Sequence, residues 1–334
     1  MPETINSWGM IGHTWATDML RKHIANQRLR HAYLITGPPG IGRRTLALRI
    51  SQSVNCLQPP SPGVPCRACH TCQRIEKMQH PDLTVVDVEE GKQVIKIEQV
   101  RALQHGITLA PYEAPYRCAL LLNFEHANPN AANALLKLLE EPPPRVIMLL
   151  TAVDAEALLP TIVSRCEQIS LRPLPIGLTA QGLQSQWHIP EKEAKSLDQI
   201  SGGRPGFALN LHENEDFAEQ RTEWLDDHQR MLNVNRVARF EYAESIAKDK
   251  VTLYKLLQTW ISLWRDVMLL AYGAAVPTTN IDRKDEIINL AATVDIHTAR
   301  SVIHMIEHTQ LLIKKNINTR LAAEVLLLEL PYLS

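Results

Sequence analysis

The sequence has almost no excess charge of either sign. It contains 35 Lys and Arg residues against 36 Asp and Glu residues, which gives a formal net charge of −1 at pH 7. A positive field over the whole protein, of the kind that captures DNA, is therefore excluded. If this protein acts on DNA, it must do so through local positively charged patches of its surface or through partner proteins.

Long apolar runs are also absent. No stretch of about 18 apolar residues occurs, so we expect no membrane-spanning helix. The segment from Met1 to Trp15 lacks a basic region followed by an apolar run, so no signal peptide is indicated. We therefore expect a cytoplasmic protein, in which six cysteines favour a metal site or free thiols over disulfides.

The length of 334 residues allows two or three domains with a sizeable core. In the first half, apolar strand candidates alternate with helix candidates, which is typical of a parallel sheet with helices on both faces. The strand candidates are residues 31–36, 82–88, 117–124 and 146–151, and the helix candidates are residues 13–30, 43–56, 97–105 and 131–140. We predict that residues 1–172 form this α/β domain.

Beyond residue 172 the pattern changes to helices alone. Pro173 and Pro175 mark a linker, after which residues 173–211 are expected to form a small helical lid. Residues 212–334 are expected to form an all-helical collar domain, with long amphipathic helices at 251–271 and 298–313.

The strand at residues 31–36 leads into a glycine loop at residues 37–42, and a helix follows. Strand, glycine loop and helix in this order are typical of a P-loop, whose pattern is G-x-x-x-x-G-K-[ST]. Gly37, Gly40 and Gly42 preserve a loop whose backbone N–H groups can curl into an anion nest.

The two residues after this loop depart from the pattern. Arg43 stands in place of the lysine, and its longer, forked guanidinium cannot simply replace a point charge. Arg44 stands in place of the hydroxyl that binds Mg²⁺, and a guanidinium cannot bind a metal. We expect the loop to hold no nucleotide, or to bind ATP only weakly and without Mg²⁺.

Four cysteines follow within a short segment. Cys66, Cys69 and Cys72 are spaced C-x2-C-x2-C, and Cys56 precedes them. Thiolates at this spacing can surround one Zn²⁺ ion tetrahedrally, so we predict a zinc module at residues 56–72. Four thiolates leave no open coordination position, which makes a structural role the expected one. Free thiols and an iron–sulfur cluster are the alternatives, although nothing in the sequence suggests redox chemistry.

Two further motifs reveal a family resemblance. The run Asn-Ala-Leu-Leu-Lys-Leu-Leu-Glu-Glu-Pro-Pro occupies residues 133–143, and Ser164-Arg165-Cys166 follows. Together they resemble the clamp-loader branch of the AAA+ ATPases, and within it the delta-prime family of bacterial DNA polymerase III. This resemblance implies an AAA+ fold for residues 1–172. It also implies that active relatives carry two acidic residues where this chain has Leu122 and Asn123, and a nucleotide-sensing arginine where it has Gly206.

The resemblance implies a specific role. Arg165 would project into a neighbouring subunit's ATP site as an arginine finger, while this chain itself would not hydrolyse ATP. Tau/gamma and delta subunits would be its partners in a hetero-pentamer that loads a sliding clamp on primed DNA at the nucleoid-associated replisome.

Two other classes of function stay open. One is an ATP-hydrolysing clamp-loader motor with an unusual P-loop. The other is a zinc-dependent nucleic-acid-binding protein, although the cysteine segment has neither interleaved aromatic residues nor a strong basic stripe.

Overall fold

The computed structural model describes residues 6–89, 91–274, 276–315 and 317–333. The chain divides into two compact units, one made of residues 1–194 with 203–207 and the other of residues 195–202 with 208–334. None of the helices in the described ranges is both long and apolar enough to span a membrane.

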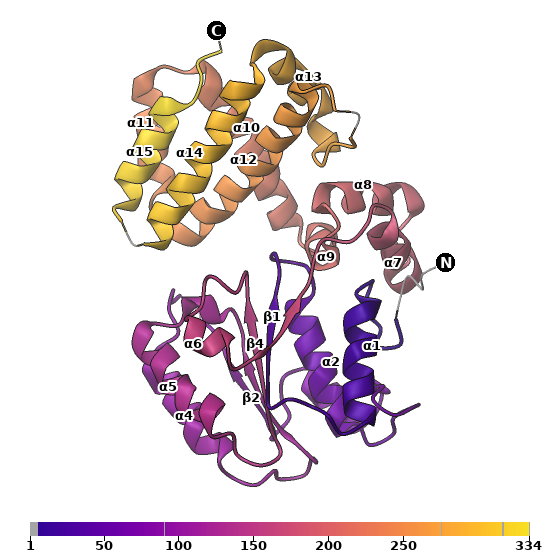
Figure 1. Ribbon diagram of the computed structural model, residues 1–334. Coiled ribbons are helices and arrows are strands. Elements are labelled where there is room, and N and C mark those ends of the chain that lie inside the picture. The colour runs from indigo at the N-terminus through magenta and orange to yellow at the C-terminus, as the bar shows by residue number, and fades with distance from the viewer. Residues whose placement is uncertain (1–5, 90, 275, 316, 334) are drawn as a thin grey trace. The chain divides into compact units, whose positions relative to one another are not determined.

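The first unit contains a parallel sheet of five strands in the order β2-β3-β4-β1-β5 (Figure 1). The strands are β1 (Ala32–Thr36), β2 (Leu83–Val86), β3 (Arg117–Leu121), β4 (Val146–Ala152) and β5 (Glu167–Ser170). The sequence patterns do not predict β5, because its sequence Glu-Gln-Ile-Ser offers only Ile169 as a fully buried side chain. The other four strands agree with the predicted ones.

Helices cover both faces of this sheet (Figure 1). On one face lie α1 (Thr14–Ala25), α2 (Arg43–Asn55) and α3 (His70–Glu76), and on the other α4 (Ile97–Ile107), α5 (Pro129–Glu140) and α6 (Pro160–Val163). Because successive strand residues point to opposite faces, Tyr33 and Ile35 join the core under α1 and α2, whereas Leu34 joins the core under α4 and α5. The predicted α/β architecture, a parallel sheet with helices on both faces, is confirmed.

The start and end of α5 follow from its sequence. The Asn128 side chain accepts a hydrogen bond from the N–H of Ala131 at 2.7 Å. Pro129 occupies the first helical position, where its missing N–H costs nothing. Leu135, Leu138 and Leu139 are buried on the inner side of the helix. Three prolines at 142–144 prevent it from continuing.

Three helices follow the linker, namely α7 (Leu178–Trp187), α8 (Glu191–Ser201) and α9 (Pro205–Glu213). The helical character expected after residue 173 is therefore present. The domain limits at residues 172 and 211 stay a prediction.

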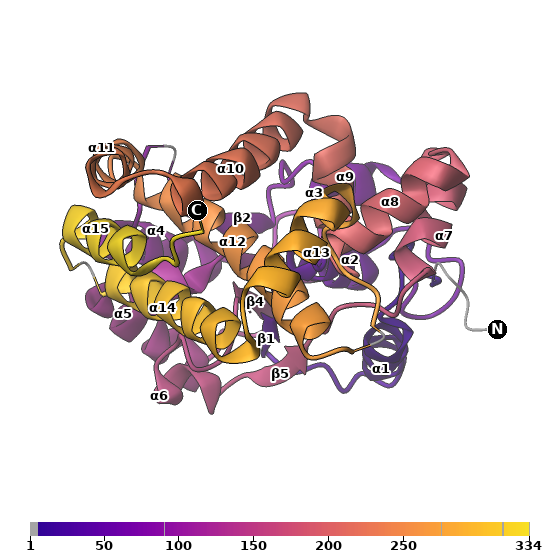
Figure 2. The ribbon, with the colours of Figure 1, turned by 90° about the horizontal axis from the view of Figure 1, so that it is seen from above.

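The second unit is formed by helices (Figure 2). Its long helices are α10 (Glu215–Asn233), α11 (Arg236–Ile246), α12 (Lys250–Ala271), α13 (Lys284–Thr293), α14 (Ile296–Lys314) and α15 (Thr319–Glu329). α12 packs against α10, α13 and α14, while α11 packs against α15. Trp260, Leu263 and Trp264 of α12 are fully buried in the core of this unit.

A buried histidine lies inside this helical core. His228 of α10 is fully buried, and its Nε2 accepts a hydrogen bond from Nε1 of Trp264 at 2.7 Å. Its ring also meets the Trp260 ring edge-on, with centroids 5.1 Å apart. Burial lowers the pKa of His228 from 6.5 to about 3, because the core cannot solvate an imidazolium.

This histidine predicts a stability loss in mild acid. Between pH 7 and pH 5 the unfolded chain takes up a proton at His228 while the folded chain does not, so the free energy of unfolding must fall as the pH falls. A pKa of 6.5 in the unfolded chain gives a contribution of roughly 2 kcal/mol over this range. Urea unfolding of the wild type at both pH values should show this loss, and His228→Gln, which retains an acceptor for Trp264, should lose about 2 kcal/mol less.

His297→Gln, a change at an exposed position, is the matched control for removing one histidine. Parallel pH dependences for the wild type and His228→Gln would contradict the prediction.

Candidate functional site

The glycine loop lies at the carboxyl edge of the parallel sheet, between β1 and α2. Ligands of open α/β sheets bind at this edge. Gly37, Gly40 and Gly42 have φ angles of 146°, 80° and 109°. Side-chain-bearing residues rarely adopt such angles. The loop therefore retains the backbone curvature of an anion nest, and it leads into the N-terminus of α2, a helix of 13 residues.

Arg43, the first residue of α2, points across the sheet edge toward the end of β3. Its Nη2 donates a hydrogen bond to Oδ1 of Asn123 at 3.4 Å, and its Nη1 lies 3.9 Å from Oε1 of Glu125. Only 10% of the Arg43 side chain and 12% of the Glu125 side chain are exposed. Burial lowers the pKa of Arg43, and the Glu125 carboxylate opposes that change. Arg44, by contrast, is exposed.

A left-handed turn at Asn123 brings Glu125 to this position. Asn123 has φ 47° and ψ 48°, which ends the strand direction and starts the short 3-10 turn Phe124–His126. The N–H of Asn123 donates to Oγ1 of Thr151 at the end of β4, and its Nδ2 donates to Oδ1 of Asp87. Asparagine tolerates this conformation better than most residues.

These residues do not fit a Mg²⁺–nucleotide complex. Mg²⁺ in phosphate sites is held by carboxylate, hydroxyl and water oxygens. At the two positions where the family resemblance implies acids, Leu122 is buried and Asn123 is bonded to Thr151 and Asp87. The Glu125 carboxylate faces Arg43 instead.

The tip of the loop is contacted by the beginning of α9. The N–H of Gly206 donates to the carbonyl oxygen of Gly40 at 2.8 Å. A Cβ atom at Gly206 would lie 3.0 Å from this oxygen, and one at Gly40 would lie 2.7 Å from the backbone nitrogen of Phe207. Close approach of the two backbones therefore explains glycine at both positions. Arg204 lies over the Phe207 ring, and burial lowers its pKa to about 10.

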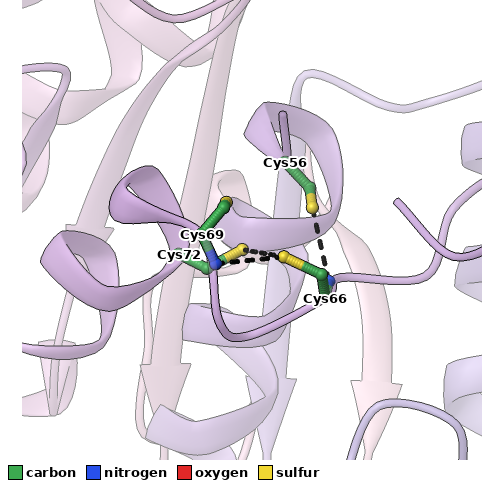
Figure 3. Close-up of side chains that lie close together, drawn as sticks. All are labelled: Cys56, Cys66, Cys69 and Cys72. Carbon is green, nitrogen blue, oxygen red and sulfur yellow. Dashed lines mark hydrogen bonds between the residues drawn. The ribbon is translucent and has the colours of Figure 1, made fainter. Parts of the chain in front are cut away.

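The four predicted metal ligands come together (Figure 3). The Sγ atoms of Cys56, Cys66, Cys69 and Cys72 all lie within 4.8 Å of one another. α2 ends just before Cys56, α3 begins just after Cys69, and Cys72 lies in the first turn of α3. Two helix ends and one loop therefore build a cluster that could hold a metal ion.

Backbone N–H groups favour the thiolate form of Cys66 within the cluster. The N–H of Cys66 donates to Sγ of Cys56 at 3.3 Å, and the N–H of Cys69 donates to Sγ of Cys66 at 3.2 Å. Burial opposes ionisation of Cys66, but hydrogen bonds from the N–H groups of Cys69 and Ala68 and from the neighbouring thiols outweigh it and lower its pKa to about 6. In the absence of a metal, burial raises the pKa of Cys56 and of Cys72. Such N–H···S bonds are the expected support for metal-bound sulfur, so the donor set fits Zn²⁺.

The remaining two cysteines lie elsewhere. Cys118 is buried in β3, where burial raises its pKa to about 12. Cys166 lies between α6 and β5, and burial likewise raises its pKa to about 12.

Arg165 lies at the surface of the first unit, just after α6. Its Nη2 donates to Oε1 of Glu140 at 2.7 Å, and its Nη1 donates to the carbonyl oxygen of Thr161 at 2.8 Å. The side chain is 35% exposed. Glu167, the carboxylate nearest in sequence, is instead paired with Arg30 at 3.8 Å. Glu140 belongs to the same motif that carries the family resemblance, so the two motifs meet in space.

Sequence reasoning missed three polar residues of these sites. Glu125 lies two positions beyond the expected acidic pair, and only the turn at Asn123 brings it to Arg43. Asp87 follows β2 without any motif around it. Glu140 lies at the end of a predicted helix, where a charged residue is expected to be solvated. Its hydrogen bond to Arg165 joins positions 25 residues apart, so no local pattern predicts it.

Comparison with known proteins supports one family. The family described as DNA polymerase III, delta subunit, matches residues 12–175. DNA polymerase III subunit delta-prime of Pseudomonas aeruginosa is 37% identical over 237 residues, covering 70% of each chain.

Two further relatives extend this result. Delta-prime of Bacillus subtilis is 30% identical over 259 residues, covering 76% of this chain and 77% of that protein. DNA polymerase III subunit tau of Salmonella typhimurium is 31% identical over 200 residues, which cover 59% of this chain and 30% of tau. The chain therefore belongs to the delta-prime subunit family of DNA polymerase III.

Proposed function

We propose that this chain is a clamp-loader subunit that does not hydrolyse ATP and that supports hydrolysis by a neighbouring subunit. Its partners would be tau/gamma and delta subunits in a hetero-pentamer, which loads the sliding clamp on primed DNA. It would work in the cytoplasm, at the nucleoid-associated replisome. Membership of the delta-prime family and the similarity to tau support this role.

The observation that carries the proposal is the contrast between two arginines. Arg43, directly after the glycine loop, has only 10% of its side chain exposed and faces Glu125, so its charge is compensated within the chain. Arg165 is partly exposed, and its carboxylate partner, Glu140, is itself 51% exposed. Exposed ion pairs contribute only about 0–1 kcal/mol, so Arg165 can exchange Glu140 for a phosphate of a neighbouring subunit at little cost.

We further propose that the cysteine cluster holds one structural Zn²⁺ ion. Cys56, Cys66, Cys69 and Cys72 would be its four ligands, and the metal would cross-link the end of α2 to α3. The Gly63 carbonyl oxygen in the same loop accepts a hydrogen bond from Nε1 of the buried Trp8 at 3.0 Å. The zinc module would therefore also hold the N-terminal segment in place.

Removal of one ligand should release the metal. Cys69→Ser is expected to lose stoichiometric zinc and to open the loop at residues 57–65 to proteases, while the sheet stays folded because none of its strands carries a ligand. Elemental analysis and limited proteolysis measure both effects. Cys166→Ser, which removes a cysteine outside the cluster, should keep one zinc per chain. A wild-type protein without zinc would refute the metal site.

The isolated chain should not turn over ATP. No carboxylate occupies positions 122 and 123 and no hydroxyl occupies position 44, so the metal and the attacking water both lack their expected ligands. Arg44→Thr, which restores only the hydroxyl, should remain inactive for the same reason. Phosphate release is measured with Mg²⁺ and ATP against a mock purification. Mg²⁺-dependent turnover by the wild type that exceeds the mock would contradict the proposal.

Arg165 should matter only in the assembled complex. Arg165→Ala is expected to leave folding, zinc content and assembly nearly unchanged, yet to slow ATP hydrolysis at the adjoining site. Arginine fingers contribute roughly 10³–10⁵ in rate, but one site of several is affected, so the total loss should be partial. Arg165→Lys should rescue poorly, because a point charge lacks the planar fork. The measurement is clamp- and DNA-stimulated ATPase of the reconstituted pentamer.

Arg74→Ala is the matched control for this experiment. Arg74 is 34% exposed and is paired with Glu113 at 2.8 Å, which resembles the environment of Arg165. Its removal should not change the ATPase rate. Equal rates for Arg165→Ala, Arg74→Ala and the wild type would show that Arg165 has no role in trans.

A further inference from the structure

The pair formed by Arg43 and Glu125 is incompletely bonded. Nη1 of Arg43 and Oε2 of Glu125 are buried and have no hydrogen-bond partner among the described residues. Nη1 lies 3.9 Å from the other carboxylate oxygen, Oε1, which is longer than a direct charge-assisted hydrogen bond. A side chain that is nine-tenths buried, on the first residue after the glycine loop, thus has unused donor capacity.

The electrostatic environment at the start of α2 favours a negatively charged group. The N-terminus of α2 has no acidic residue in its first turn, and its N–H groups and Arg43 together favour a negative charge. In the described part of the chain, Glu125 is the carboxylate that forms an ion pair with Arg43. Breaking such a buried pair by removing one partner leaves an uncompensated charge, which is strongly unfavourable.

Glu125 is held in this place by the turn before it. The N–H of Asn123 is fixed to Thr151, and the Phe124 side chain is fully buried in the core under α4 and α5. The carboxylate is therefore positioned by the ends of β3 and β4 rather than by Arg43 alone.

We propose that the Glu125 carboxylate serves as a built-in substitute for a phosphate group, and that it is the residue that excludes phosphoanions from the glycine loop. Removing its charge should convert the loop into a binding site for phosphate-class anions that needs no Mg²⁺. This inference rests on the proposed non-hydrolysing role, and it names the residue that keeps nucleotide phosphates out of the glycine loop.

The purified full chain is titrated with pyrophosphate in the absence of Mg²⁺. Isothermal calorimetry measures the affinity, and thermal unfolding measures the stability at each pyrophosphate concentration. Glu125→Gln should unfold at a lower temperature than the wild type, bind pyrophosphate at least tenfold more tightly and regain stability as pyrophosphate is added. The double variant Arg43→Met/Glu125→Gln has no charge at the site and should not bind. Glu113→Gln, which removes a carboxylate from a different ion pair, is the control and should behave like the wild type.

A second variant tests the same idea without leaving a buried charge unpaired. Arg43→Lys restores the lysine of the P-loop pattern but keeps Glu125, so it should not bind pyrophosphate. Binding by Arg43→Lys, or equal affinity of the wild type and Glu125→Gln, would overturn the proposal. ATP turnover by the wild type would instead contradict the proposed function, so the two failures are distinguishable.

Discussion

The left-handed turn at Asn123 decides the chemistry of the sheet edge. β3 reaches the carboxyl edge with buried apolar residues up to Leu122, and the left-handed residue Asn123 then ends the extended backbone and starts a 3-10 turn. The turn is fixed by hydrogen bonds from Asn123 to Thr151 and Asp87. Thr151 lies near the end of β4, and Asp87 directly follows β2. Because of this turn, the Glu125 carboxylate lies 3.9 Å from Nη1 of Arg43 and supplies the counter-charge of this guanidinium within the chain.

Helix α2 connects the two candidate sites. It begins at Arg43, at the glycine loop, and ends at Asn55, next to the first cysteine of the cluster. The middle of this helix is almost completely buried between the sheet and its helical neighbours. The helix therefore links the two sites within one continuous element, while the chemical groups at its two ends are different.

Two arginines, Arg43 and Arg165, thus have different environments in this fold. Burial commits Arg43 to an internal partner, whereas Arg165 keeps about a third of its side chain in contact with solvent. Glu140 supports Arg165 from the helix that carries the leucine-rich motif, which explains physically why these two motifs belong together. This contrast between a largely buried arginine and an accessible one is the physical basis of the proposed function.

Much of this organisation is determined by the sequence itself. The alternating strands and helices, the glycine loop and the C-x2-C-x2-C spacing are local patterns, and local patterns fix the elements and bring cysteines of one short segment together. Strand β5 was not predicted because it is defined by its pairing with β1, whereas its own short sequence has no apolar run. The pairing of Arg43 with Glu125, and of Arg165 with Glu140, was decided only by the tertiary structure, since each joins groups from different elements whose distance depends on how the strands end and how the helices pack.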